Sequence, residues 1–459
     1  MEARSAGSKS SADGRTFGYR DPEAPLLLPP TLREWLPSGH LAHFISDTVD
    51  SLNLQAFHDR YGFGGRRNQP FHPAMMVKVL LYAYCTGVFS SRKIARRLVE
   101  DVPFRVLAAG NYPAARTICD FRALHLKEME DLFMQVVKIA RECQMVKLGT
   151  IAVDGTKVKA NASRHKAMSY GRMVQAEKAL QEEIRTLLEK AGTVDRAESA
   201  KPDPTQDLPT EIARREKRLA AIQEAKARLE QRQRQADQER GRTENDERKP
   251  RGKDGKPKGG TPYKRDFGVP EDKAQEGFTD PDSRMMKRND GGFDHGYNCQ
   301  GAVDRESRMV VAAEVVDCAA DSGCLPMVVE ATKRVVGVYP QRVLADAGYR
   351  SEEIFEEMAT KPVESVVALG REGKKGSVID RGKKPHTAAM ADRMATMEGR
   401  AAYRDRKWIV KPVFGWLKNV LGFRQMSMRG MSKARAEWKL ACTALNLRRM
   451  HVMTLAKMA

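Results

Sequence analysis

Two aspartates in matching sequence contexts are the first candidates for chemistry. Asp154 lies in the segment AVDGT and Asp346 in LADAGY, each with a glycine close behind it. A carboxylate at the end of a strand, followed by a small residue that lets the backbone turn away, can point into a shared site. Carboxylate oxygens are the ligands that hard divalent cations need. An isolated Asp before Gly is also a common turn residue, so the pair, and neither residue alone, indicates a metal site.

The elements that must position this pair follow an informative order. The β-branched, alternating segment TIAVDGTKVK around Asp154 predicts a strand. The predicted elements are strands at 150–159, 297–303 and 309–316, a helix at 325–336, a strand at 342–346, a helix at 351–359 and a strand at 363–369. The order is one strand, a long insert, two strands, then alternating helices and strands, and it predicts a mixed sheet with helices.

A helical domain is predicted before the sheet, over residues 21–147, and a loose, polar tail before it, over residues 1–20. The predicted helices are 41–50, 73–86, 91–100, 114–125 and 126–143. The cations Arg92, Lys93 and Arg96 would suit a helix-turn-helix that lies against DNA. The alternative is an ordinary helical domain with solvated basic residues on its outer faces.

A long polar segment interrupts the predicted sheet. Residues 171–262 contain no Phe, Trp or Tyr and cannot form a conventional core. Apolar residues spaced three and four apart predict an antiparallel, coiled-coil-like helical hairpin within 171–246. It is either a solvated spacer or an arm for dimerisation or DNA clamping. The stretch 247–289 is predicted to be a basic linker.

Charge and cysteine usage narrow the class of protein. Lys and Arg number 80 against 60 Asp and Glu, and residues 400–459 hold fourteen basic against two acidic residues. This excess favours polyanionic partners, DNA first. Seven scattered cysteines without a Cys-x-x-Cys pair support neither a disulfide framework nor a zinc site. With no signal peptide and no apolar run of roughly 18 to 20 residues, we expect a cytoplasmic, nucleoid-associated protein.

Several motifs in order resemble the DDE transposases of bacterial insertion sequences. They are AVDGTKVKANAS around Asp154, DPDSRMMKRNDGGFDHGYNCQGAVD, LADAGY around Asp346 and VKPVFGWLKNVLGFRQMSMRG. The segments GYRDPEAPLLLPPTLREWLPSGHLAHFISD and FHPAMMVKVLLYAYCTGVFSSRKIARRL resemble the InsH-like amino-terminal domain of these proteins. The resemblance implies a ribonuclease-H-like catalytic domain over 148–170 and 290–459, which agrees with the element order above.

The resemblance also implies a mechanism and its partners. Asp154 and Asp346 would hold two Mg²⁺ ions, for which Mn²⁺ can substitute, and the metals would drive DNA strand cleavage and strand transfer. The partners would be double-stranded DNA, both terminal repeats and target, and further copies of the chain as a homodimer or higher oligomer on DNA. No phosphate-binding Gly-x-x-x-x-Gly-Lys-Ser/Thr loop occurs, so ATP-driven chemistry has no support.

Residues near the carboxyl end match DNA-backbone ligands of the family. These are Tyr403, Arg406 and Lys418, and we expect Arg424 to join them. Trp408, Trp416 and Phe414 lie among these cations and could stack on opened bases or belong to the core, which is the preferred interpretation for Phe414.

The family's third acid, a Glu directly before Pro-Val-Phe-Gly, is Lys411 here. The change removes a metal ligand and adds a cation, whose close-range repulsion is worth about 1 kcal/mol in water and about 4 kcal/mol at an intermediate dielectric. Asp405 and Glu398 lie about 240° and about 220° away around a helix, so neither shares its face. Three explanations stay open: an inactive copy that only binds DNA, a site rebuilt from outside this helix, or a Lys411–phosphate contact with weak residual activity.

Overall fold

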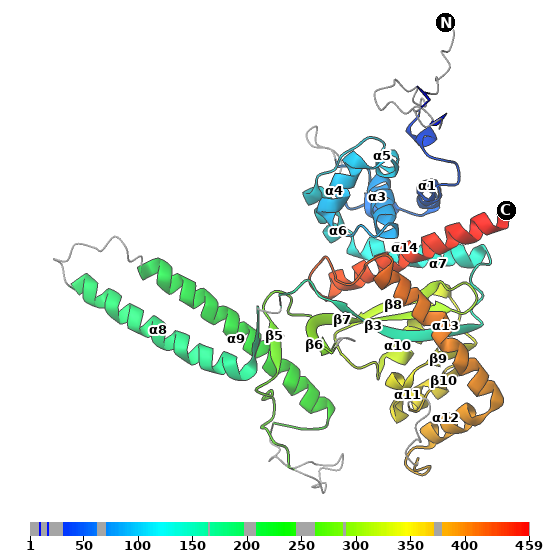
Figure 1. Cartoon of the computed structure of the whole chain (residues 1–459). Coiled ribbons are helices and arrows are strands. Elements are labelled where there is room, and N and C mark those ends of the chain that lie inside the picture. The colour runs from blue at the N-terminus through cyan, green and yellow to red at the C-terminus, as the bar shows by residue number, and fades with distance from the viewer. Residues whose placement is uncertain are drawn as a thin grey trace.

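The computed structural model describes residues 9–10, 16–17, 31–61, 70–163, 166–196, 208–244, 262–287, 291–370 and 379–458. The predicted loose tail, residues 1–20, lies outside the described residues apart from two short paired strands, β1 (Lys9–Ser10) and β2 (Thr16–Phe17). A helical region, a mixed sheet with helices and a projecting helical hairpin make up the described chain (Figure 1).

The helical region confirms the predicted helices and adds short ones. Its elements are η1 (Leu32–Trp35), α1 (Leu41–Ser51), α2 (Gln55–His58), α3 (Pro73–Cys85), α4 (Ser91–Glu100), α5 (Val102–Leu107), α6 (Ala115–Leu124) and α7 (Leu126–Glu142). Proline at the first position starts α3 because its fixed φ suits the helix and its missing N–H is not needed there. The short elements α2, α5 and η1 were not predicted, because they are too short to show a helical period.

The sheet has the order β10-β9-β3-β7-β6, with β8 also paired to β7. Its strands are β3 (Thr150–Lys159), β6 (Arg284–Lys287), β7 (Phe293–Asp304), β8 (Val310–Val316), β9 (Arg342–Ala345) and β10 (Glu364–Val367). β3 is antiparallel to β7 and parallel to β9, and β9 is parallel to β10. This mixed sheet is consistent with a ribonuclease-H-like fold, as the element order predicted.

Helices cover the sheet and tie it to the helical region (Figure 1). They are α10 (Cys324–Val336), α11 (Glu352–Ala359), α12 (Pro385–Ala395), α13 (Met397–Asn419) and α14 (Met431–Met458). α14 packs against α3 and α7 of the helical region and against β8 of the sheet. One continuous apolar core therefore runs from the helical region into the sheet.

The insert forms the predicted antiparallel hairpin, which projects away from the sheet (Figure 1). Its helices are α8 (Tyr170–Arg196) and α9 (Leu208–Glu239). The hairpin has a small core of its own that includes Met173, Leu180 and Ile222. Short strands β4 (Ala167–Ser169) and β5 (Gln275–Gly277) pair at its base.

The described part of the predicted basic linker, 262–287, carries structure. It contains β5, and it ends in β6, which pairs with β7 and joins the main sheet. The remainder of the linker, residues 247–261 and 288–289, lies outside the described residues.

Candidate active site

Two neighbouring parallel strands bring Asp154 and Asp346 together. Asp154 lies in the middle of β3, and Asp346 follows the last residue of β9 directly. Its side chain caps the short helical turn η3 (Ala347–Tyr349) by accepting a hydrogen bond from the Gly348 N–H at 2.9 Å. The two carboxylates are 18% and 36% exposed. They are thus accessible from solvent, but only partly.

The strand predicted around Asp154 is confirmed over residues 150–159, so the backbone does not turn away after Asp154 as it does after Asp346. β3 continues through Gly155 to Lys159 because every residue of this stretch pairs with β7. A Cβ atom at Gly155 would lie 2.3 Å from Asp321 Oδ1 and 2.5 Å from Gln300 Nε2. The glycine therefore makes room for other side chains of the site, and it ends no strand.

The Arg406 guanidinium lies between the two aspartates. Its Nη1 is 3.7 Å from Asp154 Oδ2 and 3.9 Å from Asp346 Oδ2, and the side chain is only 4% exposed. Within the described chain, its Nε and Nη1 atoms are buried without a hydrogen-bond partner. A cation from α13 thus neighbours both carboxylates that the sequence assigned to metal ions. The predicted contact of Arg406 with DNA requires this side chain to move, since it is buried here.

The electrostatics of Asp154 reflect this crowding. Burial raises the pKa of Asp154 to about 6, and the negative charge of Asp346 acts in the same direction. The positive charge of Arg406 and the Gly155 N–H, 3.0 Å from Asp154 Oδ1, oppose the rise. When two carboxylates lie close together in a partly buried site, either one of them is protonated or a cation binds between them.

Asp321, which the sequence did not mark as a site residue, lies in the loop between β8 and α10. Its Oδ1 accepts hydrogen bonds from Asn298 Nδ2 at 2.8 Å and Gln300 Nε2 at 2.7 Å. The segment CAADSGC looks like an ordinary turn, and nothing in it marks a site residue. The only usable signal was Gly155, since a glycine inside a strand indicates close approach by another group.

Lys411, at the position of the family's third acid, is exposed on α13. It makes no hydrogen bond or ion pair with any residue that the structure describes. Arg406, five residues earlier, faces inward instead. The part that Lys411 plays in the reaction stays a prediction.

Two other predicted DNA ligands, Lys418 and Arg424, each donate a hydrogen bond to a backbone carbonyl oxygen. Lys418 Nζ donates to the Lys157 carbonyl oxygen at 2.8 Å, and burial lowers its pKa. Arg424 donates to the Lys418 carbonyl oxygen at 3.0 Å. The Tyr403 ring is 5.6 Å from the Arg406 guanidinium. Backbone acceptors thus fix two of these cations near β3.

The predicted DNA ligands on α4 and the ring of Trp408 are exposed to solvent. On α4, Ile94 and Leu98 are buried, whereas the predicted DNA ligands Arg92, Lys93 and Arg96 are exposed. Trp408 is 71% exposed, and Phe414 is buried as preferred, with its ring 5.9 Å from that of Trp438. Trp408 is therefore available for the predicted base stacking, and Phe414 is not.

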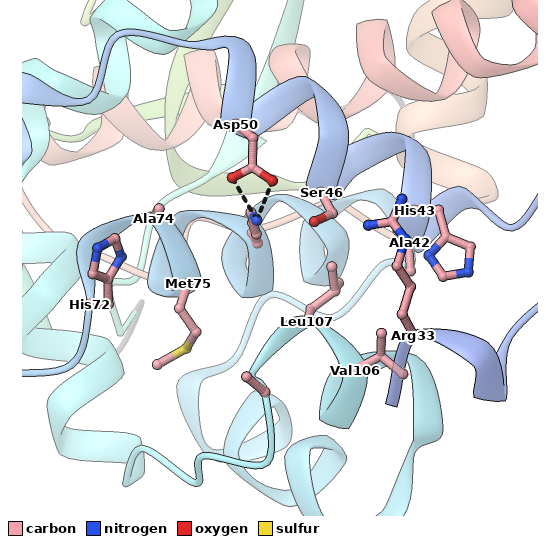
Figure 2. A pocket seen from close by; sticks show the side chains of 12 residues that line it. Arg33, Ala42, His43, Ser46, Asp50, His72, Ala74, Met75, Val106 and Leu107 are labelled. Atoms are coloured by element: carbon pink, nitrogen blue, oxygen red, sulfur yellow. Dashed lines mark hydrogen bonds and ion pairs between the residues drawn. The ribbon is translucent and has the colours of Figure 1, made fainter. Parts of the chain in front are cut away.

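A separate hollow of about 280 Å³ lies between α1, α3 and α5 in the helical region (Figure 2). Asp50 is the single acidic residue in its lining, and it pairs with Lys78 at 2.7 Å. This hollow lacks a pair of carboxylates and does not offer the chemistry of the Asp154–Asp346 site.

No group of three or more His, Cys, Asp or Glu side chains in the described ranges is arranged to hold a metal ion. No helix among them is long and apolar enough to cross a membrane.

Comparison with known families agrees with the resemblance seen in the sequence. Residues 265–447 match the family described as "Transposase DDE domain", and residues 30–124 match "Transposase domain (DUF772)". The first match includes Asp321, Asp346 and Arg406 but begins after β3, so Asp154 joins the site through the pairing of β3 with β7 and β9. Searches of curated proteins and of solved structures returned no significant match. The chain is therefore a transposase that contains a DDE domain, with an InsH-like transposase domain on its N-terminal side.

Proposed function

We propose that this transposase binds the terminal repeats of a bacterial insertion sequence and catalyses metal-dependent DNA cleavage and strand transfer at Asp154 and Asp346. One observation carries the proposal: the two carboxylates, from neighbouring strands, converge on a single buried cation, Arg406. Carboxylates kept this close in a partly buried place are suited to binding a cation.

The residues of the site fit Mg²⁺ or Mn²⁺. Mg²⁺ keeps several waters and binds proteins through one or two carboxylates together with substrate phosphates. Asp154 and Asp346 would supply these carboxylates, and the bound ions would polarise the scissile phosphate and lower the pKa of the attacking water or 3′ hydroxyl. Asn298, a neighbour of Asp321, adds a buried amide oxygen without a hydrogen-bond partner among the described residues.

The chain's own residues would bind and orient the DNA. Lys418 donates to a carbonyl oxygen of β3 and lies near enough to Asp154 for the two charges to interact. Arg424, which donates to the Lys418 carbonyl oxygen, would extend this positive charge along the DNA. The exposed Trp408 ring offers a stacking surface for a base near the cut. The α4 cations lie on the exposed face of that helix and would bind phosphates of the terminal repeat. Two or more copies of the chain would hold the paired ends of the element.

The alternative is an inactive transposase that only binds DNA. Lys411 favours the inactive alternative, because it replaces the family's third acidic ligand. The other acids of α13, Glu398 and Asp405, do not share the helix face of Lys411. Arg406 favours it too, because a guanidinium beside both aspartates competes with a metal ion. In this alternative the DNA-binding surfaces stay intact and the site does not cut.

Strand cleavage and joining on a labelled duplex that carries the element's end would decide between the two. The unaltered chain is compared with Lys411→Glu and Asp154→Ala in Mg²⁺ and in Mn²⁺. Cutting by the unaltered chain but not by Asp154→Ala supports the proposed activity. Cutting by Lys411→Glu alone supports the inactive alternative. Equal cutting by Asp154→Ala and the unaltered chain would refute the assignment of the site.

A further inference from the structure

A third carboxylate, Asp321, borders the same space as Asp346. A Cβ atom at Gly348 would lie 2.9 Å from Asp346 Oδ1 and 3.4 Å from Asp321 Oδ2. The other oxygen of Asp346, Oδ2, faces Arg406 at 3.9 Å. One oxygen of Asp346 therefore lies beside Gly348, as Asp321 Oδ2 does, and the other faces the place that Arg406 shares with Asp154.

Buried amides fix the orientation of Asp321. Asn298 and Gln300 are fully buried on β7, and both donate to Asp321 Oδ1, at 2.8 and 2.7 Å. The Tyr349 hydroxyl in turn donates to Gln300 Oε1. Oδ2 of Asp321 receives no hydrogen bond from any described residue, so it is the oxygen left to bind a ligand.

An orphaned oxygen beside this carboxylate independently indicates a ligand. Asn298 Oδ1 is buried and has no hydrogen-bond partner within the described chain. A Cβ atom at Gly155 would lie 2.9 Å from this oxygen and 2.3 Å from Asp321 Oδ1. A buried acceptor without a donor is costly unless something else satisfies it. Amide oxygens are accepted ligands of hard divalent cations.

We propose that Asp321 supplies the third carboxylate of the metal site, in place of the acid that Lys411 replaces. The inference rests on the proposed metal-dependent function. Asp321 and Asp346 border one ion-binding position, and Asp346 and Asp154 border the other, with Asp346 shared. Two carboxylates per ion satisfy Mg²⁺ when waters complete the shell.

The proposal explains why an acid on α13 is dispensable. The replacement comes from the loop before α10, so the positive charge of Lys411 can stay exposed while the carboxylate count of the site is kept. Gly155 and Gly348 leave the space that Asp321 and Asp346 occupy, because a side chain at either position would collide with a carboxylate.

Direct Mn²⁺ binding to the full chain tests the proposal without reference to activity. Isothermal titration calorimetry compares the unaltered chain with Asp321→Asn, which keeps the size of the side chain and removes its charge. We expect Asp321→Asn to bind Mn²⁺ at least about tenfold more weakly, or to bind one ion fewer. The matched control is Asp317→Asn, which removes an equal charge from the same loop, where Asp317 pairs with Arg284 at 2.8 Å. It should bind Mn²⁺ within about twofold of the unaltered chain.

Further variants separate this inference from the proposed function. If Asp154→Asn and Asp346→Asn weaken Mn²⁺ binding and Asp321→Asn does not, Asp321 is no ligand and the proposed function stands. If the unaltered chain binds no Mn²⁺ at millimolar concentration, both fail. Circular dichroism checks that each variant is folded. If Asp321→Asn unfolds, Asp321→Ala takes its place, because it introduces no new polar group into the site. Loss of affinity equal in Asp317→Asn and Asp321→Asn would also overturn the inference.

Discussion

At the scale of single residues, Arg406 controls the charge of the site. Its guanidinium is buried and lies within 4 Å of both Asp154 and Asp346. Replacing it by Gln leaves two close carboxylates without a cation, and we expect a loss of about 3 kcal/mol in the free energy of unfolding at pH 8 in EDTA. The same variant should bind Mn²⁺ about tenfold more tightly, since its internal competitor is gone.

Urea denaturation and Mn²⁺ titration measure the two effects of Arg406→Gln. Arg404→Gln, two residues before it on α13 and exposed, is the control and should change neither quantity appreciably. Unchanged metal affinity in folded Arg406→Gln would show that the guanidinium does not compete for the site.

The pKa of Asp154 makes a second prediction at this scale. Its folded-state pKa is raised to about 6 from an ordinary 3.8, so the folded chain binds a proton more tightly than the unfolded chain does. The contribution of Asp154 to stability is therefore favourable at pH 4 and is lost as the pH rises through 6. We expect Asp154→Asn, which does not titrate, to gain about 1–3 kcal/mol relative to the unaltered chain between pH 4 and pH 7.

Denaturation curves at several pH values in EDTA check this trend. Asp50→Asn is a control, because Asp50 pairs with Lys78 on the far helical region. A difference between Asp154→Asn and the unaltered chain that does not change with pH would contradict the raised pKa.

At the scale of elements, α4 tests where the chain meets DNA. The helix buries Ile94 and Leu98 and exposes Arg92, Lys93 and Arg96. If each cation neutralises one phosphate, replacing all three by Gln should lower the slope of log affinity against log salt by about 2.7. Fluorescence anisotropy with terminal-repeat DNA at several salt concentrations measures the slope.

The matched control for α4 lies on the hairpin. Arg214, Lys217 and Arg218 are exposed on α9, and their replacement by Gln removes the same charge. An unchanged slope in this control agrees with a spacer hairpin, whereas an equal loss would identify the hairpin as a DNA-clamping arm. A normal slope in the α4 variant would mean that α4 does not contact phosphates.

Elements were predictable where a period spans several residues, and contacts were not. The alternating segment around Asp154 predicted β3, and the three-and-four spacing predicted α8 and α9. β6 was placed in a linker because its RMMK sequence has no alternation, and only pairing with β7 makes it a strand. Asp321 was missed for a similar reason: its role depends on which β7 side chains lie opposite Gly155, and that register is absent from local sequence.

At the scale of the whole molecule, a buried carboxylate joins the helical region to α14, the helix that also packs against the sheet. Glu437 on α14 is fully buried. It accepts hydrogen bonds from the Tyr84 hydroxyl of α3 at 2.9 Å and from Ser427 Oγ at 2.6 Å. Its other oxygen accepts from the Ser427 and Met428 N–H groups at 2.9 and 3.2 Å. Arg122 of α6 donates to the Tyr84 hydroxyl at 3.0 Å, which completes a buried network between distant parts of the chain.

This network predicts that the helical region and the sheet unfold together. Glu437→Gln replaces one acceptor oxygen by an NH₂ group, which faces donors that it cannot satisfy, so we expect a loss of about 2–4 kcal/mol. Glu130→Gln is the control, because Glu130 also pairs with α14, through Lys439 at 2.6 Å, but is partly exposed and should cost less than about 1 kcal/mol.

Hydrogen exchange of α3 and β7 peptides in urea measures both regions at once. Joint loss of protection in α3 and β7, shifted to lower urea by Glu437→Gln, is the expected result, because the apolar core is continuous across them. Exchange of α3 while β7 stays protected would show two independent folding units, and the DNA-binding helices could then move freely relative to the carboxylates.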